Sequence, residues 1–226
     1  MKASVTGLLL LAAAAINAAV IQNDIFISGT DGYHTYRIPA IITAPDNSLL
    51  AFCEGRKNGG GDAGDIDLLM KRSTDNGKSW SRQFVIWSDG ENTCGNPCPV
   101  VDKDTGTIFL ASTWNRGDYH EKNILADKNW DGRKVFIFQS RDNGKSWSGP
   151  TEITAQAKAP DWYWYATGPG VGIQISSGQY KGRLIIPCDH SFAEVMPDVK
   201  YGSHIIYSDD HGATWKTSDY IMPGFN

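Results

Sequence analysis

Three copies of one eight-residue pattern decide the fold class of this chain. They read STDNGKSW (Ser73–Trp80), SRDNGKSW (Ser140–Trp147) and, less strictly, SDDHGATW (Ser208–Trp215). Their shared pattern is S-x-D-x-G-x-x-W, which we call the box, and their first residues lie 67 and then 68 residues apart. A regular period of this length indicates a repeated supersecondary unit.

Each box follows three short apolar segments that have the length and composition of β-strands. They are YRIPAIIT, SLLAFCE and DIDLLMKR in the first unit, PCPVVD, TIFLAS and KVFIFQ in the second, and VGIQI, RLIIP and SHIIY in the third. A further candidate strand follows the box, such as Phe84–Trp87. These runs are β-branched and aromatic and show no helical period. Four antiparallel strands per unit, repeated radially, predict an all-β propeller with about three blades in this chain.

The residues of the box favour a structural role. Asp and Ser can hydrogen-bond the backbone amides of a turn, and Gly can adopt a positive φ. Trp can cover apolar surface at the edge of a blade. We therefore interpret the box as a turn between the third and fourth strands, with no direct part in chemistry.

Composition and the first residues bound the class of protein. The chain has 226 residues, 41% of them hydrophobic, which is enough for a sizeable core. Its net charge is −4, with no concentrated basic surface for nucleic acid.

The first residues have the pattern of a signal peptide: Lys2, then an apolar run, then small residues. They predict a signal peptide over 1–18 and a secreted mature domain over 19–226. The alternative is a buried N-terminal helix. No segment is long enough for a membrane span.

The four cysteines, Cys53, Cys94, Cys98 and Cys188, do not define a disulfide scaffold. An extended CGNPC segment would hold the Cα atoms of Cys94 and Cys98 too far apart for a bridge. No convincing set of zinc ligands accompanies them. We favour small buried thiol side chains, and their pairing stays open.

Strand alternation sorts the loops between two rims. If the boxes lie at one rim, the loops between second and third strands and the starts of the first strands lie at the other. The segments collected there are Tyr36–Arg37, 54–65, Asn96, 112–133 and 188–202. Long polar loops on a rigid scaffold are where binding residues concentrate, so this rim is the candidate site.

Arg37, Arg56 and Asp62 stand out at this rim. Convergent guanidinium groups can bind a carboxylate in a planar, bidentate way. A neighbouring Asp can donate a proton if its pKa is raised. The alternatives are a salt bridge of Arg37 that closes the propeller, and solvated loop charges at Arg56 and Asp62.

At this point the sequence resembles the sialidases (neuraminidases) of glycoside hydrolase family 33. The resemblance rests on the three boxes and on YRIPA (36–40), FCEGR (52–56), GDAGDIDL (61–68), GNPCPVVD (95–102) and TGPGVGIQ (167–174). It implies a six-bladed β-propeller. It also implies an exo-α-sialidase that removes terminal sialic acids from glycoproteins, glycolipids or oligosaccharides.

The resemblance also implies residue roles. Arg37 and Arg56 match the first two of three arginines that grip the sugar's carboxylate. Asp62 matches the general acid/base, and Asn96 falls where a polar residue contacts the sugar. Four further residues of this rim match no fixed role: Trp114, Asn115, Asp189 and His190.

The implied mechanism retains configuration through a Tyr nucleophile. A carboxylate nucleophile would be repelled by the substrate's own carboxylate, whereas a Tyr hydroxyl is not, and a nearby Glu can take its proton. Asp62 would protonate the leaving oxygen and later deprotonate the attacking water. Because guanidinium groups supply the positive charge, no metal or cofactor is expected.

The sequence departs from the family pattern at its end. The family's Tyr, Glu and third Arg lie beyond the third box, and the chain stops at Asn226. We expect an N-terminal half of a sialidase that is inactive alone. The alternatives are a non-catalytic sialic-acid-binding propeller fragment and an unrelated propeller for protein interaction. Transfer in place of hydrolysis, the kind of sialic acid and the linkage preference stay open.

Overall fold

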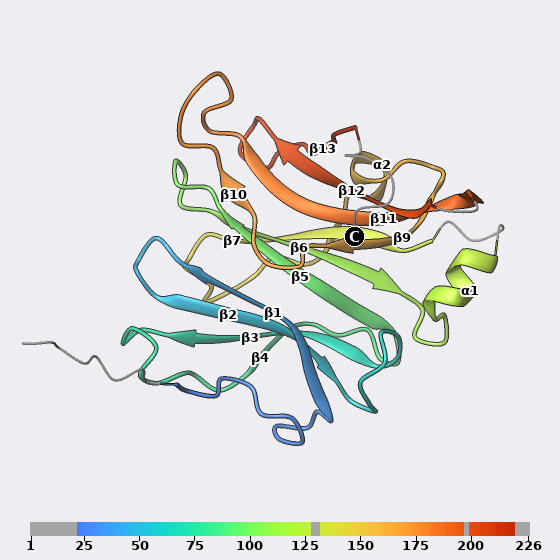
Figure 1. The fold of residues 1–226 in the computed structure, drawn as a ribbon. Coiled ribbons are helices and arrows are strands. Elements are labelled where there is room, and N and C mark those ends of the chain that lie inside the picture. Colours follow the sequence, from blue (N-terminus) through green and yellow to red (C-terminus); the bar gives the residue numbers. More distant parts are fainter. Residues whose placement is uncertain (1–21, 128–131, 197–198, 220–226) are drawn as a thin grey trace, which may run out of the picture.

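The computed structural model describes residues 22–127, 132–196 and 199–219, which form an all-β fold with two short helices (Figure 1). The predicted signal peptide, 1–18, lies outside the described residues. Neither helix of the described chain is long and apolar enough to cross a membrane.

The first two units are antiparallel four-stranded sheets that match the predicted segments. Unit 1 contains β1 (Thr35–Thr43), β2 (Leu49–Arg56), β3 (Ile66–Ser73) and β4 (Phe84–Trp87). Unit 2 contains β5 (Thr93–Val101), β6 (Ile108–Asn115), β7 (Lys134–Ser140) and β8 (Thr151–Glu152). A parallel bridge between Ile66 and Thr93 joins the two sheets.

Unit 3 has a divided first strand. It contains β9 (Trp162–Thr167), β10 (Ile173–Gln174), β11 (Leu184–Met196), β12 (Val199–Ser208) and β13 (Lys216–Thr217). Both β9 and β10 pair antiparallel with β11, so together they occupy the first-strand position. The helices α1 (Glu121–Ala126) and α2 (Thr154–Ala157) lie in the connections that follow β6 and β8. The units are stacked in chain order, from blue through green to orange (Figure 1).

Three boundaries predicted from the sequence are wrong. The first strand of unit 3 was expected at 171–175, but most of its pairing is made by the aromatic β9. The segment 188–202 was expected to be a loop, but β11 extends to Met196 and β12 begins at Val199, and the two strands pair antiparallel there. The extra cross-strand partner, β9, supports β11 beyond the point where the apolar run RLIIP ends. Residues 112–115, also expected in a loop, belong to β6.

The first strands of all three units break at a residue that precedes proline. Ile38–Pro39, Asn96–Pro97 and Gly168–Pro169 have φ of 54°, 55° and 83° at the first residue. In β1 and β5 the register shifts at this point, as in a β-bulge. Proline lacks the N–H that a continuous ladder needs, and a bulge re-aims the neighbouring side chains. Positive φ at the β-branched Ile38 costs roughly 1–3 kcal/mol, which the surrounding structure must offset.

The three boxes adopt the same turn. In the first, Ser73 Oγ accepts from Gly77 N at 2.9 Å, and the Asp75 carboxylate accepts from the amide and hydroxyl of Ser79 at 2.9 and 2.5 Å. The second and third boxes repeat these bonds within 0.1 Å. The bonding predicted for Ser and Asp is therefore present, and the three box glycines have the predicted positive φ.

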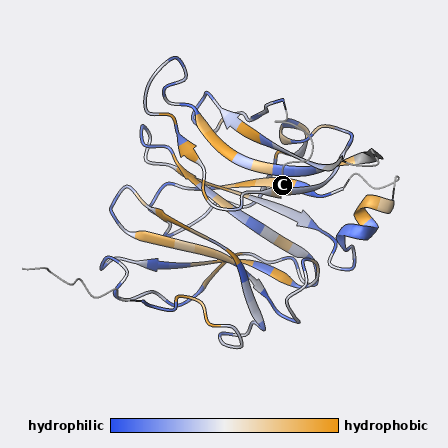
Figure 2. Ribbon diagram, viewed as in Figure 1, coloured by the Kyte–Doolittle hydropathy of each residue, from blue (hydrophilic) through white to orange (hydrophobic). Residues whose placement is uncertain are grey.

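Boxes also hold neighbouring units together. Trp147 of the second box packs edge-on against Phe52 of unit 1, with ring centroids 5.8 Å apart. Trp215 of the third box packs in the same way against Phe109 of unit 2, at 5.9 Å. One apolar core lies between units 1 and 2, and another lies between units 2 and 3. The apolar stretches of these strands appear in orange in Figure 2.

We expect Gly212→Ala to destabilise the fold far more than Gly178→Ala. Both glycines have φ of +80°, but an added Cβ at Gly212 would lie 2.2 Å from Phe109 Cζ, whereas Gly178 has open space around it. The left-handed conformation alone costs about 1–2 kcal/mol. Overpacking adds about 1–3 kcal/mol at Gly212 alone. Urea denaturation would measure the difference, and equal losses would contradict the packing of this box on unit 2.

Two buried histidines lie in the core of unit 3. His190 and His204 are 0% and 2% exposed, and their Nδ1 atoms are 3.0 Å apart. His204 Nε2 contacts the Tyr165 hydroxyl at 2.9 Å, and Trp162 stacks on His190 at 3.5 Å. Burial lowers the pKa of both histidines. Because one Nδ1 must accept from the other, the rings cannot both be protonated in place.

This pair predicts a loss of stability in mild acid. The folded state keeps both histidines neutral, whereas the unfolded chain protonates them below their ordinary pKa of about 6.5. Stability should therefore fall as pH drops below about 6.5, by up to about 1.4 kcal/mol per pH unit for each histidine. Urea denaturation between pH 7.5 and 5 would show this, and His34→Gln, at an exposed position, should leave the slope unchanged. A flat profile would contradict the prediction.

Candidate active site

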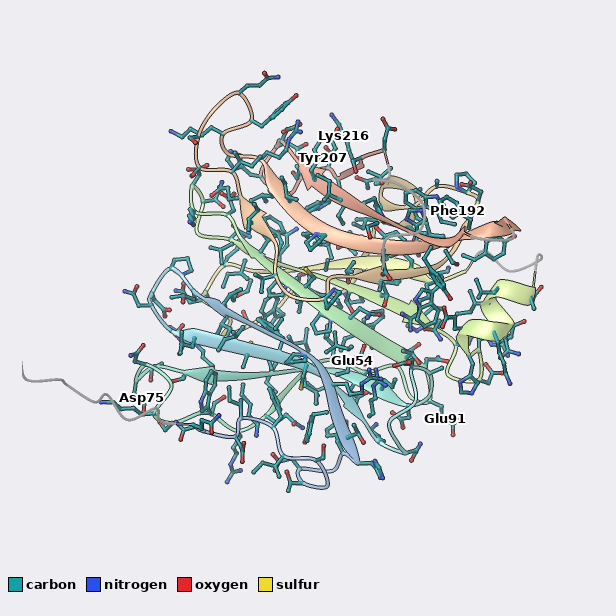
Figure 3. All side chains as sticks on the ribbon, viewed as in Figure 1. Glu54, Asp75, Glu91, Phe192, Tyr207 and Lys216 are labelled. Carbon is teal, nitrogen blue, oxygen red and sulfur yellow. The ribbon has the colours of Figure 1, made fainter. Side chains whose placement is uncertain are left out.

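Strand pairing separates the two rims as the sequence predicts. Thr35, Arg56 and Ile66 are paired across β1, β2 and β3, so these strand ends share one rim. The first box begins at the opposite end of β3. Figure 3 shows Glu54, near the end of β2, and Asp75, in the box, at opposite ends of the sheet. We call the rim with Arg56 the site rim.

Arg37, Arg56 and Asp62 meet at the site rim. Arg37 Nη1 and Arg56 Nη1 lie 2.7 and 2.8 Å from the same oxygen, Asp62 Oδ1. The side chains of Arg37 and Asp62 are 46% and 60% exposed, and that of Arg56 is 3% exposed. Arg37 and Asp62 are therefore accessible to a ligand. Both arginines contact the same carboxylate, that of Asp62.

The guanidinium of Arg56 bonds to other groups of the protein. Its Nε and Nη2 donate to Glu54 Oε2 at 2.9 and 2.5 Å. Its Nη1 donates to the carbonyl oxygens of Gly60 and Gly61 at 2.6 and 2.7 Å, besides contacting Asp62. Every guanidinium nitrogen thus has a partner. In this structure the buried guanidinium holds the loop that carries Asp62, and direct binding of a ligand by Arg56 stays a prediction.

Asn96 lies where units 1, 2 and 3 meet. Its main-chain amide donates to Glu54 Oε1 at 2.8 Å, and its main-chain carbonyl accepts from Thr167 Oγ1 at 2.5 Å. Its side-chain Oδ1 accepts from Arg133 Nη1 and Thr113 Oγ1, both at 2.7 Å. Asn96 is therefore at the site rim, as predicted. Most of its polar atoms form hydrogen bonds that connect the three units.

Glu54 is a site residue that the sequence reasoning missed. It is 2% exposed, pairs with Arg56 and accepts from Asn96 across the unit boundary. A Cβ at Gly95 would lie 2.4 Å from Glu54 Oε1, so this carboxylate also requires glycine at position 95. A signal was present: Glu54 and Arg56 are two residues apart in one strand, which places both on the same face.

Arg133 is the second missed residue. It is 2% exposed, and its guanidinium stacks on Trp164 at 3.6 Å. Burial lowers its pKa to about 10, so it remains charged near neutrality. It follows a long segment of low periodicity, and nothing in that segment distinguishes it from a solvated loop arginine.

The four residues without assigned roles have different environments. Asn115 is buried and accepts from Arg133 Nε at 2.9 Å, and Trp114 Nε1 donates to Asp89 at 2.8 Å. Burial raises the pKa of Asp189 to about 6. His190, expected on a loop, lies in the core of unit 3.

All four cysteines are unpaired and buried, which confirms the favoured interpretation. Burial raises the pKa of each thiol, so none is a reactive thiolate.

One cluster among the described residues has the composition of a metal site. Ligand atoms of Asp102, Asp104 and His211 lie within 4.8 Å of one another, at the rim that carries the boxes. The Asp102 carboxylate already accepts from Thr105 and Gln174 and contacts His211 Nδ1 at 2.9 Å. The cluster joins units 2 and 3 at the rim opposite Asp62, so it takes no part in the site.

Comparison with known proteins identifies the family. Residues 47–223 match the model of the BNR repeat-like domain, and the chain belongs to this family. It is 38% identical over 173 residues to an exo-alpha-sialidase of Aspergillus fumigatus, covering 69% of this chain and 41% of that protein. It is 35% identical over 207 residues to sialidase-3 of Mus musculus, covering 84% and 47%. The chain therefore spans less than half the length of these relatives.

Solved structures agree with this assignment. The fold superimposes on the Hadza microbial sialidase Hz136 with a TM-score of 0.75 at 29% identity, covering 87% of this chain and 39% of that one. It is also similar to the leech intramolecular trans-sialidase, with a TM-score of 0.73 at 17% identity, covering 90% and 46%. The latter similarity shows the fold alone. The resemblance to sialidases drawn from the sequence is confirmed.

Proposed function

We propose that this chain forms the N-terminal half of the catalytic propeller of an exo-α-sialidase. The observation that carries the proposal is the convergence of Arg37 and Arg56 on Asp62 at the rim opposite the boxes. The substrates would be sialylated glycoproteins, glycolipids or oligosaccharides. The chain would be secreted after loss of the signal peptide over 1–18.

The three units would be three blades of a six-bladed disc, with the boxes as its Asp-box repeats. Apolar side chains on the first strands, or directly beside them, support this. Ile41, Val171 and Ile173 are 50%, 39% and 58% exposed and line one cavity of about 780 Å³. In a closed propeller the first strands surround the axis, so these side chains would face further blades.

The site residues would divide the work of binding and proton transfer. Arg37, which is half exposed, would bind the substrate carboxylate by charge-assisted hydrogen bonds. That contact would draw Arg37 away from Asp62 and leave Asp62 with one cation partner in place of two. Arg56 would hold Asp62 in position, and the side-chain amide of Asn96 would donate a hydrogen bond to the sugar.

The remaining catalytic groups would come from sequence outside these 226 residues. A Tyr nucleophile, a Glu that takes its proton and a third carboxylate-binding Arg complete a retaining mechanism. Asp62 would protonate the leaving oxygen first and then deprotonate water. The second candidate is a non-catalytic sialic-acid-binding fragment, which the convergence of Arg37 and Arg56 on one carboxylate supports equally well.

Two measurements on the purified 226-residue chain test the proposal. Titration with N-acetylneuraminic acid, followed by ¹H–¹⁵N NMR, should shift resonances of the site rim, whereas N-acetylglucosamine, which has no carboxylate, should not. Turnover of a fluorogenic sialoside should be negligible. No response to the acid sugar would refute the proposed binding, and rapid turnover would refute the need for outside groups.

A further inference from the structure

We propose that Arg133 is a positioning residue that fixes the orientation of the Asn96 side-chain amide and anchors the loop of Asp62. The inference deepens the proposed function and depends on it for the identity of the ligand. The arrangement of the protein atoms can be tested without any ligand.

The guanidinium of Arg133 is buried and its donors are distributed over three units. Nε donates to Asn115 Oδ1 at 2.9 Å and Nη1 donates to Asn96 Oδ1 at 2.7 Å. Nη1 also reaches the Tyr165 carbonyl at 3.3 Å, and Nη2 donates to the Asp62 carbonyl at 3.2 Å. Within the described chain, no carboxylate lies within ion-pair distance of this arginine. Its hydrogen bonds to neutral oxygens therefore determine its role.

Arg133 sets the orientation of the Asn96 amide unambiguously. An arginine can only donate, so the atom of Asn96 that faces Nη1 must be the oxygen. The Thr113 hydroxyl donates to the same oxygen at 2.7 Å and reinforces this orientation. The Nδ2 group must then point away from Arg133, and the described residues offer it no acceptor. It is free to donate to an acceptor oxygen of a bound sugar, either a hydroxyl or a carbonyl.

Arg133 also restrains the segment that carries Asp62. This residue lies in a loop with glycine at positions 59, 60, 61 and 64. Glycine-rich backbone loses much conformational freedom when it is ordered. Arg56 holds the loop through the carbonyls of Gly60 and Gly61, and Arg133 holds it through the carbonyl of Asp62. The carboxylate is thus presented from a backbone that is fixed on both sides.

The arginine itself is held rigidly in place. Its amide donates to the Tyr163 carbonyl at 3.1 Å, and its carbonyl accepts from Lys158 Nζ at 3.0 Å. A Cβ at Gly132 would lie 2.3 Å from the Tyr163 carbonyl oxygen, so the chain approaches β9 as closely as glycine allows. With Trp164 stacked on the guanidinium, the group has a single well-defined position. Its carboxylate neighbours at longer range are Glu54, Asp189, Asp62 and Glu121.

The experiment compares Arg133→Lys with two control variants of the 226-residue chain, without ligand. Lysine keeps the charge but lacks the planar fork that bridges four oxygens. Asn96→Asp identifies the Asn96 side-chain amide resonances by their disappearance. Thr113→Val removes the weaker of the two donors to Oδ1. Thermal denaturation of each variant shows whether it is folded at the temperature used.

In the wild type we expect the Asn96 amide pair as two sharp resonances away from the random-coil position. In Arg133→Lys they should broaden or move to that position, and amide exchange in the segment 57–65 should accelerate at least tenfold. In Thr113→Val both effects should be clearly smaller. Unchanged resonances and unchanged exchange in Arg133→Lys would overturn the proposal. If Arg133→Lys fails to fold, Arg133→Gln, which keeps one amide donor, is judged by the same two readouts.

N-acetylneuraminic acid then separates the two proposals. The acid sugar should shift the Asn96 amide resonances in the wild type, and Arg133→Lys should weaken its binding at least tenfold. If the wild type does not respond, the proposed function fails, while the ligand-free comparison still decides the role of Arg133. If the wild type binds and Arg133→Lys binds equally well, the positioning role fails and the proposed function stands.

Discussion

Arg37→Ala is expected to abolish measurable binding of N-acetylneuraminic acid while leaving the fold intact. Arg37 lies at the site rim beside Asp62 with an accessible guanidinium, and its side chain is 46% exposed. A bound sugar would cover Arg37 and its own carboxylate, and removing one partner of a buried hydrogen-bonded charge pair typically costs about 2–5 kcal/mol. Since about 1.4 kcal/mol is a factor of ten, the affinity should fall by roughly 30-fold or more.

Stability provides an internal check on Arg37→Ala. Its ion pair with Asp62 joins two partly exposed side chains, and such pairs contribute about 0–1 kcal/mol. The melting temperature should therefore hardly change. Arg141→Ala is the matched control, because it removes the same charge from an exposed position in the second box. Full binding by Arg37→Ala, or an equal loss in Arg141→Ala, would contradict the assignment of Arg37 to the carboxylate.

The repeat and the sorting of the rims were predictable from the sequence. Both follow from local rules: strand length, turn chemistry and the alternation of turns between two ends of a sheet. The same rules brought Arg37, Arg56 and Asp62 to one rim, where each arginine lies within hydrogen-bond distance of Asp62. Such features depend on neighbours that lie close in the chain, so one sequence is enough to find them.

The contacts between units were not predictable in the same way. Arg133 meets Asn96, 37 residues away, and Asp62, 71 residues away, and no local pattern encodes either contact. The accessibility of Arg37 and Arg56 was not predictable either, because their side chains are 46% and 3% exposed although the two residues are of the same type. The long β11–β12 hairpin was missed because its support comes from β9, a neighbour in space that the apolar pattern of β11 does not reveal.

Glu54→Gln is expected to cause the largest loss of stability of any isosteric change at the site. Glu54 and Arg56 form a buried pair whose side chains are each 3% exposed. Leaving one member of a buried ion pair without its partner costs about 3–5 kcal/mol. Arg56 would keep one counter-charge, Asp62, which is 60% exposed and therefore well screened. For a chain of this size the melting temperature should fall by roughly 6 °C or more.

Two further variants show whether the loss comes from the unpaired charge. Glu152→Gln is the control, because this carboxylate is 46% exposed and lies 3.9 Å from Lys134, so it should change stability by less than about 0.5 kcal/mol. Glu54→Gln combined with Arg56→Met removes both buried charges. If the charge dominates, the double variant should lose less than the sum of the single variants, measured by urea denaturation. Additive losses would mean that units 1 and 2 are held together by the hydrogen bond that the main-chain amide of Asn96 donates to Glu54, and not by the ion pair.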